Sequence, residues 1–268
     1  KKGKLFKDKE IKDLLAKDYK KYNKQIIDLE KKISNENEKP NFKNDELRKR
    51  QYLSGLSIED LELILHPMAE EGKEASGSMG DDTPVAVLSS HFRPVSHYFR
   101  QNFSQVTNPP IDSLRENKVM SLKTRFGNLG NILDFDNLTE ENIYVLDSPI
   151  LTNSEFNRFK KFFSKKTKEL DCTFDTSSSL KDRIEEIREE AETSVREGST
   201  CLVLTDKNIS DKKASIPSIL TVGAVHSYLV KQGLRGYCSL NVECSDALDT
   251  HSFAVLIGVG ATTVNPYL

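Results

Sequence analysis

From Val85 to the end of the chain, short apolar runs alternate with amphipathic stretches, and this alternation constrains the fold more than any other feature. The apolar runs are typical of buried strands, and the amphipathic stretches open with helix-capping signals such as Thr152-x-x-Glu155. Strands separated by helices need crossover connections, which make the sheet parallel and place helices on its faces. The sequence therefore predicts an α/β domain.

Six apolar runs predict strands, at residues 85–88, 143–146, 170–174, 201–204, 237–242 and 262–264. Six strands are two fewer than a (β/α)8 barrel needs, so an incomplete barrel and an open parallel sheet both fit. We favour a parallel βα-repeat domain that resembles an incomplete (β/α)8 barrel, because the units recur without a visible switch in order.

The first part of the chain differs from the rest in charge. Residues 1–50 carry 17 basic and 10 acidic side chains, whereas the other 218 residues carry 22 and 31. Apolar side chains spaced three and four apart predict one helical face, made of Leu15, Tyr19, Tyr22, Ile26, Leu29 and Ile33. We therefore predict a basic amphipathic helical arm and linker over residues 1–45 and a central α/β domain over residues 46–268. Acidic residues interleave with the lysines of the arm, which disfavours nucleic acid as a partner.

Neither a membrane nor a disulfide framework is predicted. The longest apolar runs have about five residues, whereas a membrane-spanning helix needs roughly 18 to 20. The four cysteines show no C-x-x-C spacing, so we expect reduced thiols in a cytoplasmic protein. The chain begins at Lys1 without Met and stops at Leu268 without a tail, which leads us to expect a piece of a longer protein.

Small and polar residues cluster between residues 66 and 84, around Gly72, Gly77 and Gly80. Glycine permits positive φ, and Thr83 is held extended by Pro84, so this stretch predicts a shaped loop that runs into a strand. Such a loop presents backbone N–H groups to an anion or a substrate, but a tight connection without any ligand fits equally well. Its spacing matches neither the dinucleotide nor the phosphate-loop pattern.

No catalytic, cofactor-binding or metal-binding set follows from the spacing of the residues. Asp81 and Asp82 are adjacent, and neighbours on an extended segment point to opposite faces, which suits a shared metal poorly. The histidines form no H-x-x-x-H pair, and no G-x-S-x-G sequence occurs. We therefore expect the isolated fragment to be noncatalytic.

Two further patterns leave alternatives open. Residues 105–112 combine a rigid Pro-Pro pair with polar side chains, which suits either a positioning loop or a plain connector. Gly258 and Gly260 form a G-x-G turn of the kind that holds phosphate in barrels. This turn makes an autonomous phosphate-binding α/β barrel enzyme the alternative function.

Long motifs in one order along the chain resemble the central domain of the glutamate synthase large chain. They are HPMA at 66–69, SMGDDTP at 78–84, FRQNFSQVTNPPID at 99–112, VMSL at 119–122, SPIL at 148–151, VGAVH at 222–226, HSFA at 251–254 and NPYL at 265–268. The resemblance covers nearly the whole chain, although the lysine-rich stretch before Asn44 matches loosely.

The resemblance implies a part of a large flavoenzyme that makes two glutamates from glutamine and 2-oxoglutarate. In this family the central domain connects a glutamine amidotransferase domain to an FMN-binding domain of the same chain. FMN and an iron–sulfur cluster belong to the full-length enzyme, and no cofactor is implied for this fragment. A small NADPH-oxidising subunit is a further implied partner, and the electron donor is either NADPH or ferredoxin.

The resemblance also implies that the domain helps to wall an ammonia channel. Ammonia becomes ammonium in bulk water at neutral pH, so a water-poor passage keeps it nucleophilic. The candidate channel or interdomain residues are Ser78, Met79, Gly80, Asp81, Asp82, Thr83 and Asn108. Thr83 is our first choice among them.

Overall fold

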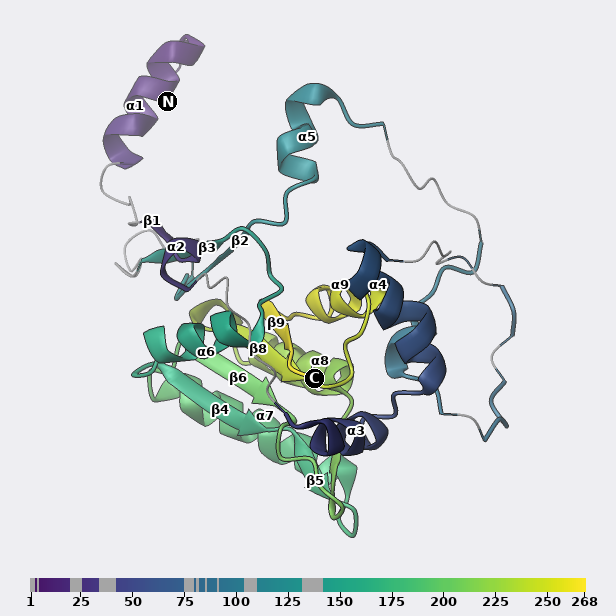
Figure 1. Cartoon of the computed structure of the whole chain (residues 1–268). Coiled ribbons are helices and arrows are strands. Elements are labelled where there is room, and N and C mark those ends of the chain that lie inside the picture. Colours follow the sequence, from purple (N-terminus) through teal and green to yellow (C-terminus); the bar gives the residue numbers. More distant parts are fainter. Residues whose placement is uncertain are drawn as a thin grey trace.

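The computed structural model describes residues 3, 5–19, 26–33, 42–74, 80, 82–84, 86–90, 92–103, 110–131 and 142–268. Its centre is a four-stranded parallel sheet with the order β4-β6-β8-β9 (Figure 1). The strands are β4 (Thr167–Asp171), β6 (Cys201–Thr205), β8 (Ser239–Cys244) and β9 (Thr263–Pro266). The prediction of an α/β fold with a parallel sheet is confirmed.

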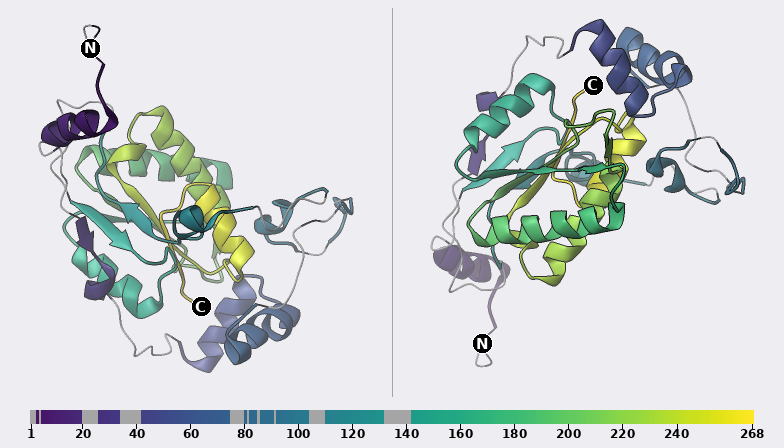
Figure 2. Two further views of the ribbon diagram at one scale, coloured as in Figure 1. Left: turned by 90° about the horizontal axis from the view of Figure 1, so that it is seen from above. Right: turned by 90° about the horizontal axis from the view of Figure 1, so that it is seen from below.

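Helices cover both faces of this sheet (Figure 2). One face packs on the crossover helices α7 (Leu180–Arg196) and α8 (Ser218–Lys231) and on α9 (Thr250–Gly258), through a core that includes Leu202, Val242 and Val225. The other face packs on α6 (Asn153–Phe162), through Val203 and the rings of Phe156 and Phe159. Because β6 is buried on both faces, all of its side chains are buried, as is typical of a central parallel strand.

A smaller sheet lies beside the main one. It has the order β1-β3-β2, in which β3 (Ile143–Leu146) pairs parallel with β1 (Ile26–Asp28) and antiparallel with β2 (Thr124–Phe126). After β3 the chain reaches Ile150, which bridges to Val264 of β9. The predicted strand at 143–146 therefore exists, but it belongs to a separate sheet that adjoins the edge of the main one.

The last described pair of strands lies beyond the end of β4. The strands β5 (Thr173–Asp175) and β7 (Lys213–Ser215) pair antiparallel. The predicted strand at 170–174 is thus split at Cys172, since the chain leaves the main sheet there. Among the described residues the main sheet is open. The resemblance to an incomplete barrel stays a prediction.

Two predictions from the apolar pattern are wrong. Residues 86–88 form a turn and not a strand, and Val87 and Leu88 are exposed. Among the described residues, this run pairs with no strand. Residues 26–28 form β1 and do not continue the helix predicted from Leu15, because their backbone pairs with β3. The tertiary pairing overrides the helical spacing.

The remaining helical elements precede β3, except for η3, which lies between α8 and β8. They are α1 (Asp8–Tyr19), α2 (Glu30–Ile33), α3 (Asn44–Leu53), the π-helical η1 (Asp60–Leu65), α4 (His66–Glu71), the 3-10 helices η2 (Val95–Tyr98) and η3 (Arg235–Tyr237), and α5 (Ser113–Val119). Leu29 and Ile33, beside and within α2, are buried in the same core as α6. Residues 26–33 are thus packed on the α/β core, whereas a helical arm and a boundary at residue 45 stay predictions.

Two helix starts carry reciprocal capping bonds, and that of α6 was predicted from the sequence. Ser57 and Asp60 exchange hydrogen bonds between side chain and backbone N–H, at 2.9 and 3.1 Å. Thr152 and Glu155 make the same reciprocal capping box at the start of α6. None of the helices in the described part of the chain combines the length and the apolar character that a bilayer span requires.

Two glycines give opposite predictions for stability. Gly260 has φ +125°, and a Cβ added there would lie 2.4 Å from Cγ of His226, whereas Gly223 lies in α8 with open space around it. We expect Gly260→Ala to cost roughly 1–3 kcal/mol of unfolding free energy through strain, and Gly223→Ala to add about 0.5–1 kcal/mol through helix propensity. Thermal denaturation of both variants checks this. Equal melting temperatures for the two variants would contradict the assignment.

Candidate functional site

The candidate loop ends beside the start of the 99–112 motif. Gly80 bridges to Gln101, and the carbonyl of Thr83 accepts a hydrogen bond from the guanidinium of Arg100. The end of the glycine-rich loop and the start of the 99–112 motif, which we singled out separately, therefore lie together. Asp82 is described and exposed. The candidates Ser78, Met79, Asp81 and Asn108 lie outside the described residues.

Residues next to the candidate loop and next to the 99–112 motif contact the first turn of α9. The carboxylate of Glu74 accepts a hydrogen bond from the backbone N–H of Thr250 at 3.3 Å. Nε2 of His251 lies 2.9 Å from the carbonyl of Ser96, within η2. Glu74 and Ser96, which are far from residues 250 and 251 in the sequence, thus both contact the start of α9.

A buried carboxylate occupies the carboxyl end of the parallel sheet, where open α/β sheets place their ligands. Glu243 of β8 is 1% exposed, and it lies 2.6 Å from Nζ of Lys207 and 3.2 Å from Nζ of Lys160. The hydroxyl of Thr205 donates to it at 2.7 Å. Burial alone would raise the pKa of Glu243, but the hydrogen bonds and charges of these neighbours outweigh it and hold the pKa below the ordinary value.

Asp206 follows β6 at the same end of the sheet and is 3% exposed. Its Oδ2 accepts hydrogen bonds from the hydroxyl of Ser215 at 3.0 Å, and from the N–H and hydroxyl of Ser245 at 3.1 and 2.6 Å. Burial, with the charge of Asp246, raises the pKa of Asp206 to about 6, although hydrogen bonds from Ser245 and Tyr267 oppose the shift. This carboxyl group thus joins β6, β7 and the loop after β8.

The raised pKa of Asp206 predicts a pH dependence. The carboxyl group of Asp206 has a pKa of about 6 in the folded protein and 3.8 in the unfolded chain. Above pH 6 the ionised carboxylate therefore lowers the free energy of unfolding, and this loss becomes smaller as the pH falls to 4. We expect the unfolding free energy of Asp206→Asn, relative to the parent protein, to rise by roughly 2–2.5 kcal/mol between pH 4 and 8.

The control is the exposed Asp175, whose pKa is lowered by hydrogen bonds from Ser177. For Asp175→Asn the relative stability should fall with increasing pH only below about pH 4, so between pH 4 and 8 its profile should be nearly flat. Denaturant titrations across this pH range measure both slopes, and a flat profile for Asp206→Asn would refute the assignment.

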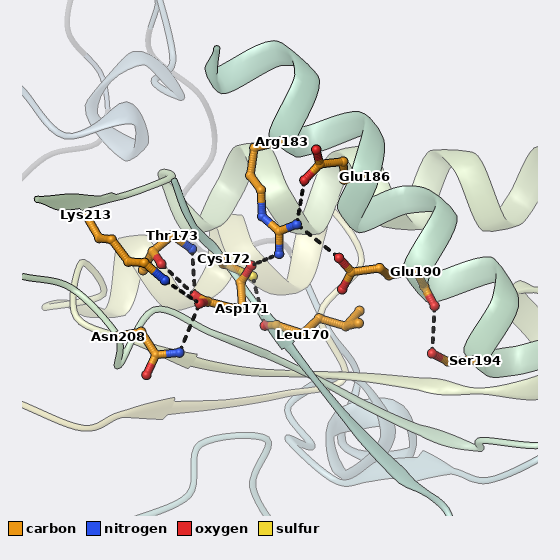
Figure 3. Close-up of polar contacts among 10 residues, drawn as sticks. All are labelled: Leu170, Asp171, Cys172, Thr173, Arg183, Glu186, Glu190, Ser194, Asn208 and Lys213. Atoms are coloured by element: carbon orange, nitrogen blue, oxygen red, sulfur yellow. Dashed lines mark hydrogen bonds and ion pairs between the residues drawn. The ribbon is translucent and has the colours of Figure 1, made fainter. Parts of the chain in front are cut away.

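An open hollow of about 370 Å³ lies between the end of β4, the β5–β7 pair and the start of α7. Figure 3 shows its polar contacts: Asp171 accepts from Thr173 at 2.7 Å and from Asn208 at 3.0 Å, and Lys213 lies 3.6 Å away. Arg183 donates to the carbonyl of Asp171 at 2.8 Å and also pairs with two glutamates of α7. Asp171, Arg183 and Lys213 are therefore each held by neighbouring groups, and Arg183 joins α7 to the end of β4.

The chemistry of the cysteines and carboxylates in the described residues is that of a packed core. All four cysteines are free and buried, and burial raises the pKa of Cys201 to about 12 and of Cys238 to about 11. These groups therefore stay thiols at neutral pH and are poor nucleophiles. Within the described ranges, no three His, Cys, Asp or Glu side chains gather as a metal site.

Sequence reasoning missed the buried carboxylates at the carboxyl end of the sheet. Asp206 directly follows β6, whose first four residues are apolar, and this position at a strand end is a signal that could have pointed to it. Glu243 directly follows the strand predicted at 237–242 and gives the same signal, although its lysine partners come from other elements and could not be predicted.

The fold and its sites define an α/β domain with a parallel sheet whose charged groups are paired internally. The family model of the glutamate synthase central domain matches residues 49–268. The chain belongs to this family, as the resemblance of its motifs led us to expect.

Curated relatives bear full-length enzyme names. The chain is 52% identical to the NADPH glutamate synthase large chain of Azospirillum brasilense over 99% of its residues, and 36% identical to that of Bacillus subtilis over 99%. It is 39% identical to the chloroplastic ferredoxin-dependent glutamate synthase of Spinacia oleracea over 85%. The chain spans 18%, 17% and 14% of the length of these relatives.

Proposed function

We propose that these residues form the central connecting domain of a cytoplasmic glutamate synthase. The domain links the glutamine amidotransferase domain to the FMN and iron–sulfur synthase domain, and it helps to form the ammonia channel between them. The full-length enzyme then makes glutamate from glutamine and 2-oxoglutarate, as an oxidoreductase acting on CH–NH2 donors. Support for the connecting role comes from the family itself, which is that of the glutamate synthase central domain.

The observation that carries the channel proposal is the convergence on α9. The end of the candidate loop is tied to Arg100 and Gln101, and its start is tied through Glu74 to the first turn of α9. A passage for a small neutral molecule needs its lining held in place, and the described ends of this loop, Glu74 and Thr83, each have a hydrogen-bond partner. On this proposal Ser78 to Thr83, with Asn108, line the channel or its interdomain mouth.

The organisation of the chain forms part of the same proposal. Residues 1–45 form a basic arm and linker, and residues 46–268 form the central domain, whose strands approach an incomplete barrel. FMN and the iron–sulfur cluster are bound by other parts of the full-length chain. A small NADPH-oxidising subunit is a further partner where NADPH is the donor, and the relatives include both NADPH and ferredoxin enzymes.

The geometry gives no support to an autonomous phosphate-binding enzyme. Gly258 and Gly260 lie between α9 and the start of β9, at the amino end of that strand. Phosphate sites of barrels lie at the opposite, carboxyl end of the strands. The positive φ of Gly260 serves a close approach to His226 instead.

The channel proposal predicts the behaviour of Thr83→Val in the full-length enzyme. This change removes a hydroxyl at nearly constant volume, so folding should be kept while ammonia escapes. We expect glutamine hydrolysis to exceed glutamate formation and free ammonia to appear in the medium. The measurement is ammonia release against 2-oxoglutarate consumption.

Thr176→Val, an equal change at an exposed turn next to β5, serves as the control and should keep the two half-reactions matched. One-for-one coupling in Thr83→Val would remove Thr83 from the channel assignment.

A further inference from the structure

The stretch of chain that carries the candidate loop has one buried residue, and it lies in the 3-10 helix η2. Among the described residues from 42 to 125 only Ser96 is buried, and its neighbour Val95 packs against the main core. The carbonyl of Ser96 lies 2.9 Å from Nε2 of His251, in the first turn of α9. This contact therefore fixes where η2 sits on the core.

The contact assigns the proton of the His251 ring. A carbonyl oxygen only accepts, so Nε2 carries the proton and donates it to Ser96. The other ring nitrogen, Nδ1, is buried and has no hydrogen-bond partner among the described residues. In the described part of the chain, the hydrogen bonding of this side chain is therefore directed at η2.

The ring stands on a capped helix end that packs on the core. Asp249 caps α9 by accepting a hydrogen bond from the backbone N–H of Ser252 at 2.8 Å. Ser252 is buried, and Phe253 packs against the main core. The donor of His251 is thus held from the side of the helix, and η2 is the partner that it holds.

The carbonyl of Ser96 also closes the last turn of η2. It accepts a second hydrogen bond from the backbone N–H of Phe99, at 3.0 Å. A carbonyl oxygen has two lone pairs, so it accepts both bonds at once. A shift of this carbonyl away from His251 therefore moves the turn that leads out of η2.

The residues directly after this turn hold the end of the candidate loop. Arg100 donates to the carbonyl of Thr83, and Gln101 bridges to Gly80. Gln101 comes five residues after Ser96, so little chain lies between the anchored carbonyl and the two contacts with the loop. The path from the core to the loop runs through one short helix.

We propose that His251 is a positioning residue for the candidate channel loop. Its Nε2–H holds η2, and η2 places the two residues that contact the end of the loop. The inference rests on the proposed channel function, and it names the side chain of the core that sets the position of the channel wall. His251 acts through η2 and not on the passing molecule.

Hydrogen exchange of the full-length enzyme, read by mass spectrometry, tests the proposal at two places. The amide of Phe99 reports the closure of η2, and the amides of residues 101 and 102 report the bridge to Gly80. In His251→Asn the shorter side chain withdraws the donor from the carbonyl. We expect both places to exchange about two- to tenfold faster, as the loss of one hydrogen bond allows. His251→Gln keeps an amide N–H near the position of Nε2, so both rates should match those of the parent enzyme.

The ammonia balance gives a readout that a merely structural residue leaves unchanged. In His251→Asn, glutamine hydrolysis should exceed glutamate formation, and His251→Gln should restore one-for-one coupling. The matched control is His226→Asn, because the ring of His226 accepts a hydrogen bond from Arg235 at 3.1 Å, at the amino end of the sheet. This variant should leave both the exchange at η2 and the coupling at the parent level.

A second variant keeps the test decisive where His251→Asn fails to fold. Arg100→Leu cuts the path beyond η2, so exchange at residues 101 and 102 should rise while Phe99 keeps its parent rate. Faster exchange at Phe99 in this variant would show that η2 is not held from the core, and it would overturn the proposal.

The outcomes separate the positioning role from the channel. Unchanged exchange at residues 101 and 102 in His251→Asn would overturn the proposal, and so would a His251→Gln variant that behaves like His251→Asn. Tight coupling in His251→Asn while Thr83→Val leaks would overturn it as well. Faster exchange in His251→Asn, with tight coupling in both variants, would end the channel proposal and keep His251 as the residue that positions the loop.

Discussion

The buried carboxylate of Glu243 is the interaction on which the carboxyl end of the sheet depends. It joins Thr205 of β6, Lys207 after that strand and Lys160 of α6 to β8, so one charged group links both the sheet and a covering helix. The stems of the lysines also pack, since Nζ of Lys160 lies 5.5 Å from the ring centre of Phe156. A buried charge is tolerated when it is paired, and loss of one partner is strongly destabilising. Glu243 therefore fixes how α6 sits on the sheet.

The same logic extends to the other charged clusters. Asp206 joins β6, β7 and the loop after β8 through two serines, and Asp171 with Arg183 joins β4 to α7. Each cluster lies at the end of a strand, where many α/β proteins bind ligands. In this domain Glu243 is paired with two lysines, Asp171 is held by Thr173 and Asn208, and Asp206 is held by two serines, which agrees with a part of an enzyme that positions its neighbours. The function we propose is therefore carried by surfaces and loops outside the sheet.

The C-terminal half of the fold could be predicted from the sequence, because its local signals and its burial agree. The capping box of Thr152 and Glu155 begins α6, and the run at 201–204 lies in a strand buried on both faces. The N-terminal half could not, because the backbone of residues 26–28 pairs with β3, more than a hundred residues away. The run at 85–88 has strand-forming residues, yet its apolar side chains have no partner among the described residues. The candidate site was predicted as two separate motifs, and only the structure brings Thr83 and Arg100 together.

The central claim is that the charged clusters of the sheet hold the domain and do no chemistry, and Glu243→Gln in the full-length enzyme tests it most directly. The variant keeps the shape of the side chain but leaves two lysines beside a neutral amide. We expect it to cost roughly 3–5 kcal/mol of unfolding free energy, while glutaminase and synthase turnover per folded molecule stay within about twofold of the parent enzyme. Loss of a proton-transferring group instead lowers turnover by about a hundredfold or more. Such a loss in turnover, with thermal stability unchanged, would contradict the account.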